Sequence, residues 1–441
     1  MKKSCLILFF IIICTMGFTS ELEMKSDESV LIIQSFAEQS SLQNAGAMPG
    51  DVIVKYNDKN VTSLKLLSQF KEEAINEEVE ILLKRDSQLL TLTIPKGQLG
   101  VYLKELRSDH KFANDVKMID GIGKLDWGIG MENSFLACVY LLEQKFGYKL
   151  FYDDIVGISG YAFRSHFFAG FCPSSPDATV GYNNGGKILA ELGYKGNFYH
   201  LKNGETVEKD LESKSKAEML EIIKASIDKG FPVFAIDLIE IPEWGLITGY
   251  QNEGKDLLCR TYYDKTQGYE IAEKFPWAIY VIDDKDISEI IPLYDKSLQI
   301  ALEMYETEKY ENYFFGIKAL EIWIQNLQVE EHYSNLKDEE LEEAKHANWW
   351  IYLSMMDARR IAVEYLKTNL EKFSFKKMDL DKLIKIYEKE DKLLQAEFEN
   401  IPSTMTVEKI EWTQEKREYQ IKVLTEFMKL ELEALEMLKV I

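Results

Sequence analysis

The chain has 441 residues, of which 46% are hydrophobic and 12% aromatic. A chain of this length and composition forms about two to four globular domains, which excludes a protein disordered throughout. The formal net charge is −22 at pH 7. Nucleic acids bind clustered lysine and arginine side chains, and no basic run follows Lys2 and Lys3. The sequence therefore argues against nucleic acid as a partner.

The first twenty residues have the pattern of a secretory signal peptide. Lys2 and Lys3 precede an apolar run from Leu6 to Ile13, and small residues follow. The run is short for a membrane span. We expect cleavage between about residues 16 and 21. The predicted location is outside the cytoplasm, either secreted or tethered to a membrane. Lipidation at Cys14 and an uncleaved anchor stay open as alternatives.

Residues 29–104 have the pattern of a small β-rich domain. Alternating apolar residues predict strands in SVLIIQSF and VIVKYN, an amphipathic helix in LKLLSQFKEEA and a hairpin in EVEILLKRDSQLLTLTI. The segment NAGAMPGDVIVKYNDKNV resembles the AGL..GD.I...NG..V pattern of bacterial PDZ domains. The resemblance implies a domain that binds the C-terminus of a peptide or protein.

The peptide-binding loop of that family lies before the first strand, where this chain has the acidic segment ELEMKSDE. A similar sequence, PKGQLGVYL, stands at the other end of the domain. In a permuted PDZ-like domain, the carboxylate loop would consist of Gly97, Leu99, Gly100 and Val101. Its backbone N–H groups would face the peptide C-terminus, and the strand after it would pair with the peptide. A glycine-containing turn into the last strand is the alternative.

From about residue 119 the sequence predicts alternating helices and strands. MENSFLACVYLLEQKFGYKL predicts a helix, and PVFAIDL, WGLITGY, DLLCRTYY and AIYVIDD predict strands. A leading helix followed by an antiparallel sheet is a papain-like α+β layout. The segments KFGY, DIVGISG, DKGFPV and EWGLITGY resemble two groups, over residues 125–285. One is the papain-like peptidases that trim bacteriocin leaders, and the other is the N-terminal domain of the butirosin-biosynthesis acyltransferase family.

Enzymes of this kind need a thiolate at a helix N-terminus, an imidazole base and an acid that orients it. The resemblance places the nucleophile position at Asn133 and Ser134, the histidine position at Glu243 and the orienting acid at Asp264. Cys138, one helical turn further along, is the other candidate nucleophile. A carboxylate with an ordinary pKa of about 4 is a poor base for a serine hydroxyl. The resemblance thus implies a catalytically degenerate domain.

Polar residues near the expected strand ends and turns predict a ligand-binding cleft. Besides Glu243, the candidates are Asn133, Ser159, Arg164, Asp237 and Trp244. Arg164 suits a carboxylate or phosphate, and Asp237, Glu240 and Glu243 together suit a hard cation. No spacing forms a convincing metal motif, and we expect no cofactor. For each residue, a structural ion pair or a solvated loop is the alternative.

Residues 291–441 contain three candidate helix breakers, Pro292, Gly316 and Pro402, and predict an antiparallel helical bundle. The expected protein is therefore multidomain α+β: a signal peptide over 1–20, a PDZ-like domain over 29–104, a papain-like domain over 119–290 and a bundle over 291–441. The expected function is exported binding of a peptide or small ligand. The alternatives are an active thiol- or serine-dependent hydrolase or acyltransferase, and a structural envelope adaptor acting through its PDZ domain.

Overall fold

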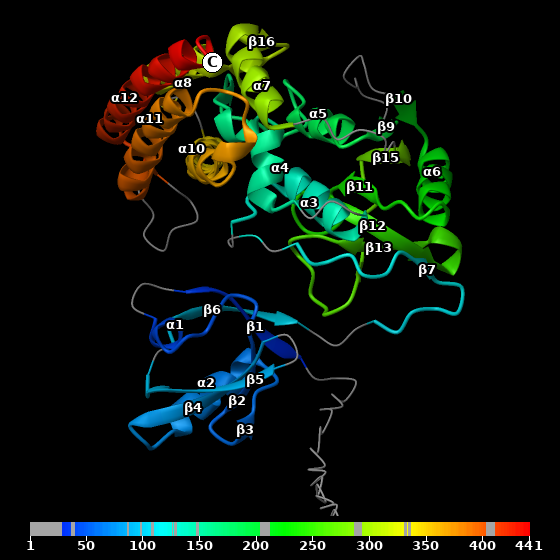
Figure 1. Cartoon of the computed structure of the whole chain (residues 1–441). Coiled ribbons are helices and arrows are strands. Elements are labelled where there is room, and N and C mark those ends of the chain that lie inside the picture. The colour runs from blue at the N-terminus through cyan, green and yellow to red at the C-terminus, as the bar shows by residue number, and fades with distance from the viewer. Residues whose placement is uncertain are drawn as a thin grey trace, which may run out of the picture.

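The computed structural model separates a small β-rich body from a larger α+β body that ends in helices (Figure 1). The residues described are 29–36, 40–85, 88–97, 99–106, 110–125, 127, 130–146, 150–202, 212–285, 293–329, 333, 337–402 and 411–441. The predicted signal peptide and the predicted turn at Asp86-Ser87 lie outside them. The fold class is mixed α+β, with several sheets and a C-terminal helical region.

The small body is an antiparallel sheet with two short helices. Its strand order is β5 (Gln88–Pro95), β4 (Glu78–Arg85), β2 (Val52–Tyr56), β1 (Val30–Phe36) and β6 (Val101–Leu106), and β3 (Lys59–Asn60) pairs with β2. The helices are α1 (Ser41–Asn44) and α2 (Leu64–Glu73). Along β4, buried Val79, Ile81 and Leu83 alternate with more exposed residues, since successive side chains of a strand point to opposite faces. One face of the sheet therefore carries the core of this body.

The larger body is built on a second sheet, antiparallel except for its first pair. Its order is β10 (Glu212–Lys214), β9 (Tyr194–Leu201), β15 (Ala278–Lys285), β11 (Val233–Ile236), β12 (Trp244–Gln251), β13 (Asp256–Arg260) and β14 (Glu270–Ile271), and β7 (Lys117–Met118) pairs with β12. The four residues of β11 are all buried. A strand buried on both faces needs cover on both sides.

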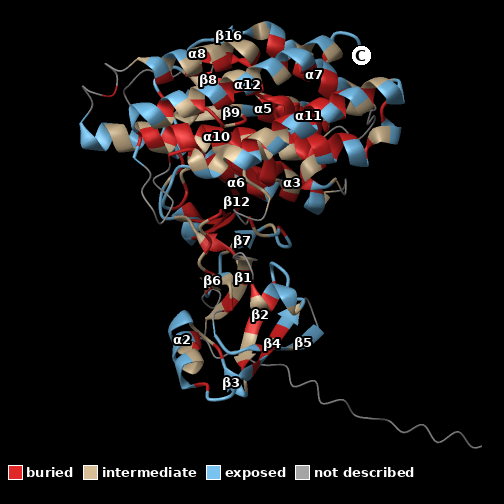
Figure 2. Ribbon diagram, turned by 90° about the vertical axis from the view of Figure 1, so that its left-hand side faces the viewer, coloured by how far each residue is buried: buried red, intermediate tan, exposed pale blue. Residues whose placement is uncertain are grey.

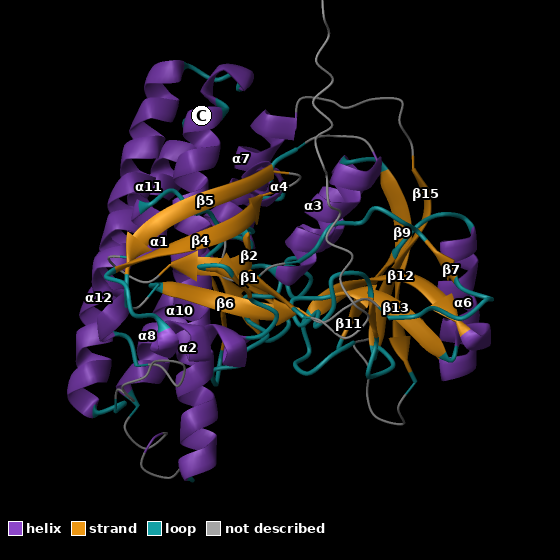
Figure 3. Ribbon diagram, turned by 90° about the horizontal axis from the view of Figure 1, so that it is seen from below, coloured by secondary structure: helices purple, strands orange, loops and turns teal. Residues whose placement is uncertain are grey.

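Two helices supply that cover. Helix α3 (Ser134–Phe146) packs on the face that carries Phe234 and Leu246, and helix α6 (Lys216–Asp228) packs on the face that carries Ala235 and Ile247. Further elements follow α3: α4 (Tyr152–Ile158), η1 (Tyr161–Phe163), β8 (His166–Phe168) and α5 (Asn184–Glu191). Seen from below, α3 lies between the sheet and the C-terminal helices (Figure 3). The start of α3 is thus held against the start of β12.

The C-terminal helices are α7 (Leu293–Thr307), α8 (Gly316–Gln328), α10 (Asp338–Thr368), α11 (Lys377–Glu397) and α12 (Gln414–Leu438). The sequence predicts a helix throughout YENYFFGIKALEIWIQNL, and this is wrong for its first residues. They form β17 (Tyr313–Phe315), which pairs with β16 (Lys309–Tyr310) and with β8. Positive φ angles at Glu311 and Gly316 (51° and 53°) set the turns on either side, so the helix begins only at Gly316.

The helices and the second sheet share one packed interior (Figure 2). Arg359 of α10 is fully buried and forms ion pairs with Glu390 of α11 and Glu431 of α12. Its guanidinium also donates to the backbone oxygen of Ala162 (2.9 Å) and the hydroxyl of Ser165 (2.8 Å). A single side chain therefore joins three helices to the segment that follows α4.

Candidate functional site

Asn133 fixes the start of α3. Its side-chain oxygen accepts the backbone N–H of Leu136 (3.1 Å), which makes it a helix N-cap. Ser134 is the first helical residue, and its hydroxyl donates to Oε2 of Glu243 at 2.5 Å. The backbone N–H of Trp244, the first residue of β12, donates to the same hydroxyl at 3.2 Å. The structure thus brings Asn133, Ser134, Glu243 and Trp244 together.

The Glu243 carboxyl is weakly acidic in this position. Burial raises its pKa to about 7, the hydrogen bond from Ser134 acts in the opposite direction, and the charge of Asp177 raises it further. The carboxyl is therefore partly protonated at neutral pH. A group with this pKa can accept or donate a proton near physiological pH, unlike an exposed glutamate.

Asp177 belongs to the same site, although no sequence motif pointed to it. The indole N–H of Trp244 donates to its Oδ2 (2.9 Å). Its Oδ1 accepts the backbone N–H and the hydroxyl of Thr179, at 2.7 and 2.8 Å. This is the local bonding of an Asx turn, and the Asp-Ala-Thr order in the loop is the only signal for it in the sequence. Two carboxyl groups therefore flank Trp244.

Asp264 is placed differently from the orienting acid that the resemblance implies. It accepts the backbone N–H of Thr261 (2.8 Å) and pairs with Arg260 (3.2 Å). Burial raises its pKa, while the charge of Arg260 lowers it. No hydrogen bond joins it to Glu243 among the described residues. Asp264 stabilises the turn after β13. The acid whose charge raises the pKa of Glu243 is Asp177.

Cys138 lies one turn inside α3 and is fully buried. Burial raises the pKa of its thiol well above the usual value, and the charge of Glu243 adds to the effect. Because the thiolate is the reactive form, this cysteine is chemically inert in the folded protein. Cys259 is also buried and Cys172 partly so, and all three described cysteines are free. The geometry favours packing over catalysis for Cys138.

Ser159 has a local structural role. It is fully buried, donates to the backbone oxygen of Val156 (2.8 Å) and accepts the backbone N–H of Tyr161 (3.1 Å). Both hydrogen bonds close the turn between α4 and η1. Its hydroxyl therefore bonds the backbone on both sides. These contacts indicate a structural role and not the predicted role in ligand binding.

Asp237 and Glu240 do not join Glu243 in a cation site. Asp237 pairs with Lys274 (2.8 Å) and Glu240 pairs with Lys265 (3.0 Å). In the described part of the chain, no three His, Cys, Asp or Glu side chains are grouped so that they could hold a metal ion. The two acidic residues form ordinary surface ion pairs.

Arg164 lies beside a separate small cavity, and Pro176 connects the two places. The side-chain amide of Asn133 (3.1 Å) and the hydroxyl of Tyr161 (2.5 Å) both donate to the backbone oxygen of Pro176. Pro176, Tyr161 and Arg164 line that cavity. Arg164 is therefore a neighbour of the Ser134 site through Pro176, and no contact joins it to Glu243 among the described residues.

The predicted carboxylate loop lies between β5 and β6 of the small body. Gly97 and Gly100 have positive φ angles of 144° and 69°. Leu99 is buried between them, and its backbone oxygen accepts the hydroxyl of Ser40 (3.0 Å). A Cβ on Gly100 would lie 2.6 Å from the Cα of Ser40, so only glycine fits there. The loop leads into Val101 and strand β6.

Strand β6 lies at the end of its sheet and beside α2. It is the last strand in the order, after β1. The backbone N–H of Leu64, at the start of α2, donates to the Glu105 carboxylate of β6 (3.0 Å). Phe70 of α2 and Val101 and Leu103 of β6 are partly buried against the core of the small body. The loop thus leads into an edge strand that contacts the start of α2.

No protein family matches this chain, and no curated protein matches it in sequence. Among the described residues, no helix is both long and apolar enough to cross a lipid bilayer. A functional assignment therefore rests on the geometry of the two sites and on the chemistry of their side chains.

Proposed function

We propose that this chain is an exported binding protein. Its PDZ-like domain captures the C-terminus of a peptide or protein, and its papain-like domain, without thiol chemistry, holds a peptide or small ligand. The observation that carries the proposal is the position of β6. It is an edge strand that follows a loop of left-handed glycines and lies beside α2.

This arrangement suits binding by addition of a strand. An extended peptide can pair with an edge strand through backbone hydrogen bonds, while pockets for alternate side chains give specificity. Glycines with positive φ turn successive backbone N–H groups toward one point, where they bind a carboxylate. The apolar side chains of Phe70, Val101 and Leu103 offer a surface for a hydrophobic last residue.

The central site supports binding over thiol catalysis. The resemblance assigns Ser134 and Glu243 to the cysteine and histidine positions of the papain-like families, these two side chains are hydrogen-bonded, and Cys138 is buried with a raised pKa. The Ser134 site also contains Asp177, so its charged groups are acids. An amine or amide of a ligand suits such a site, because it can donate hydrogen bonds to Glu243 and Asp177.

A peptide titration tests the PDZ-like domain. Fluorescent decapeptides ending in Val, Leu, Phe or Ala are titrated with the full chain, each with a free and with an amidated C-terminus. We expect tighter binding of the free acids. Gly100→Ala should weaken it, because the new Cβ collides with Ser40. The matched control is Gly46→Ala, a left-handed glycine with no atom within 4 Å of a Cβ.

Equal affinity for the acid and amide forms would contradict the proposal for this domain. So would equal effects of Gly100→Ala and Gly46→Ala, since both substitutions strain the backbone and only the first deforms the loop. The central site is assessed separately, by binding of amine-containing peptides to Glu243→Ala, which should be weaker than to the parent chain. A failure at one site leaves the other intact.

A serine-dependent hydrolase is the second candidate, and one observation favours it. The Ser134 hydroxyl donates to a carboxyl whose pKa is about 7, which is a workable general base at neutral pH. Turnover of peptides, esters or thioesters that Ser134→Ala abolishes would establish this function in place of the first. The double substitution Ser134→Cys with Glu243→His restores the pattern of the resembled families. It should raise reactivity toward thiol alkylators if these positions correspond.

A further inference from the structure

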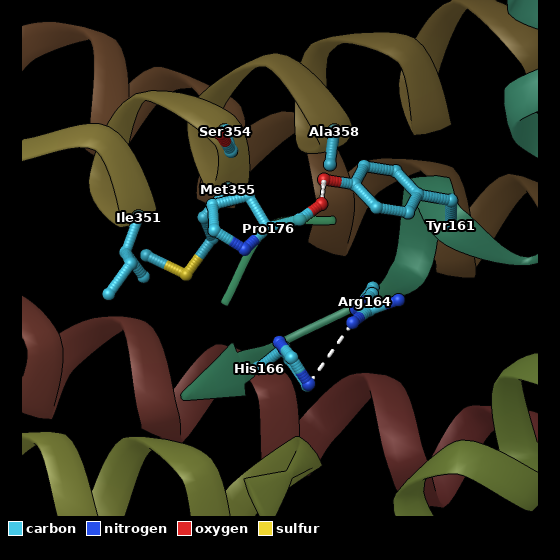
Figure 4. A pocket seen from close by; sticks show the side chains of 8 residues that line it. All are labelled: Tyr161, Arg164, His166, Pro176, Ile351, Ser354, Met355 and Ala358. Atoms are coloured by element: carbon cyan, nitrogen blue, oxygen red, sulfur yellow. Dashed lines mark hydrogen bonds between the residues drawn. The ribbon is translucent and has the colours of Figure 1, made fainter. Parts of the chain in front are cut away.

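A small cavity lies where η1 and β8 meet α10 (Figure 4). Tyr161, Arg164, His166 and Pro176 line it on one side, and α10 lines it on the other side between residues 351 and 358. Its volume is about 20 Å³. A space of this size admits about one water-sized group. The three titratable side chains that line it, those of Tyr161, Arg164 and His166, belong to one short segment.

The Arg164 guanidinium is buried and has only neutral partners. Its Nη atoms donate to Asn184 Oδ1 (2.9 Å) and to Nε2 of His166 (3.0 Å). They also donate to three backbone oxygens, those of Tyr182 (3.3 Å), Val180 (3.1 Å) and Ser175 (3.4 Å). Among the described residues, no carboxylate lies within ion-pair distance of it. Its Nε is buried and has no hydrogen-bond partner.

The surroundings of Arg164 differ from those of Arg359, the fully buried arginine of α10. Arg359 is equally buried but has two glutamates beside it. An unpaired charge away from water is costly, so buried charges are normally paired. Burial lowers the pKa of Arg164 to about 10, which leaves it charged at neutral pH. Among the described residues, Arg164 is therefore a buried cation without a direct ion pair, and the carboxylate whose charge favours its ionised form, that of Asp177, is more remote.

His166 is a neutral neighbour of Arg164 at this cavity. An arginine can only donate, so Nε2 of His166 accepts in the contact with Arg164 and the imidazole is neutral. Burial and the neighbouring Arg164 both lower its pKa well below the usual value, in agreement with this state. The proton is then on Nδ1, which is buried, and the backbone of Ser175 favours a proton on this imidazole. Nε of Arg164 is thus the donor beside this cavity that lacks an acceptor among the described residues.

We propose that this cavity is an anion site, which takes a small monovalent anion of halide size, or the single carboxylate group of a larger molecule. An anion supplies both a negative charge in direct contact with Arg164 and an acceptor for its Nε, whereas water supplies only the acceptor. A volume of about 20 Å³ favours a halide ion or one carboxylate group over the larger phosphate and sulfate ions. Because α10 forms one wall, a bound anion also ties the central part of the chain to the helices.

Bromide is the probe for this site. Crystals of the full chain grown in sodium bromide are measured at the bromine absorption edge, and thermal unfolding is followed in sodium bromide and in sodium isethionate at equal ionic strength. We expect an anomalous peak beside Arg164 and His166. Bromide at tenfold its dissociation constant should multiply the folding equilibrium constant about elevenfold relative to isethionate. Displacement of the peak by acetate would show that a carboxylate uses the same site.

Two variants make the test specific. Arg164→Gln and Ser354→Val, which partly fills the cavity, should both lose the bromide effect. Arg360→Gln is the matched control, because it removes an arginine of α10 that pairs with Asp357 outside the cavity lining, and it should keep the effect. The proposal is overturned if crystals grown in bromide show a water molecule and no bromide at this site. It is also overturned if isethionate stabilises the folded protein as much as bromide does. If Arg164→Gln does not fold, Ser354→Val and the bromide crystals decide the question.

Discussion

Replacing Glu243 by glutamine should make the protein more stable at alkaline pH and change little at acidic pH. The carboxyl has a reference pKa of 4.5, and the folded environment raises it to about 7. The folded state therefore holds this proton more tightly than the unfolded state. Stability falls as pH rises between these two values and is constant above the higher one. Glutamine keeps an oxygen that can accept the Ser134 hydroxyl and has no proton to lose.

The size of the effect follows from the shift. Each pKa unit corresponds to about 1.4 kcal/mol, so the ionised Glu243 costs the fold about 3 kcal/mol at pH 8. At pH 5 the difference between the parent and Glu243→Gln should be below about 1 kcal/mol. Urea titrations followed by tryptophan fluorescence measure this difference, because all seven tryptophans lie outside residues 29–104, the small β-rich body.

A neighbouring carboxylate is the control for this measurement. Glu240→Gln removes an exposed glutamate that pairs with Lys265, and its effect should be nearly the same at pH 5 and pH 8. Parallel stability profiles for the parent and Glu243→Gln across this range would refute the reasoning. They would mean that the Glu243 carboxyl is solvated, with an ordinary pKa, and that it is not a weak acid held against Ser134.

Three further predictions concern the thiol, the buried arginine and the leader. Cys138→Ala should leave ligand binding unchanged, and Cys138 should react with thiol reagents only after unfolding, as mass spectrometry of labelled peptides would show. Arg359→Met should destabilise the protein by about 3–5 kcal/mol, because it leaves Glu390 and Glu431 buried without a cation. The triple variant Arg359→Met with Glu390→Gln and Glu431→Gln should recover much of the lost free energy of unfolding, as measured by urea titration. No recovery would argue against the charge explanation. Finally, N-terminal sequencing of envelope or medium fractions should find a start between about residues 16 and 21, whereas an intact Met1 in a cytoplasmic pool would contradict export.

The strands of the second sheet could be predicted because their signals are local. PVFAIDL and WGLITGY are short apolar runs bounded by glycine and proline, and they form β11 and β12. Strand β17 was missed for the opposite reason. Its partner β8 is remote in sequence, and the apolar spacing of the following helix continues smoothly through Tyr313–Phe315. A pairing between distant segments has no local signature.

The site divides in the same way. The sequence assigned Ser134 and Glu243 to one site through the resemblance to papain-like families, and the two side chains are hydrogen-bonded in the structure. Asp264 was assigned to the wrong place, since its ion pair with Arg260, four residues earlier, holds it at its own turn. Asp177 lies in a loop whose path depends on tertiary packing. The burial of Arg164 without an ion pair among the described residues is likewise invisible in the sequence, because it depends on which side chains the fold places around the guanidinium.

The pairing of β17 with β8 has a consequence for the order of events during synthesis. The partner of His166 in this ladder, Phe315, leaves the ribosome about 150 residues later. At roughly 5–20 residues per second, the earlier strand waits about 7–30 s for it. Through that interval residues 166–168 lack the strand with which they pair in the folded protein. The nascent protein thus has a long period in which its middle is exposed to misassembly, and this period ends only when the last third of the chain arrives.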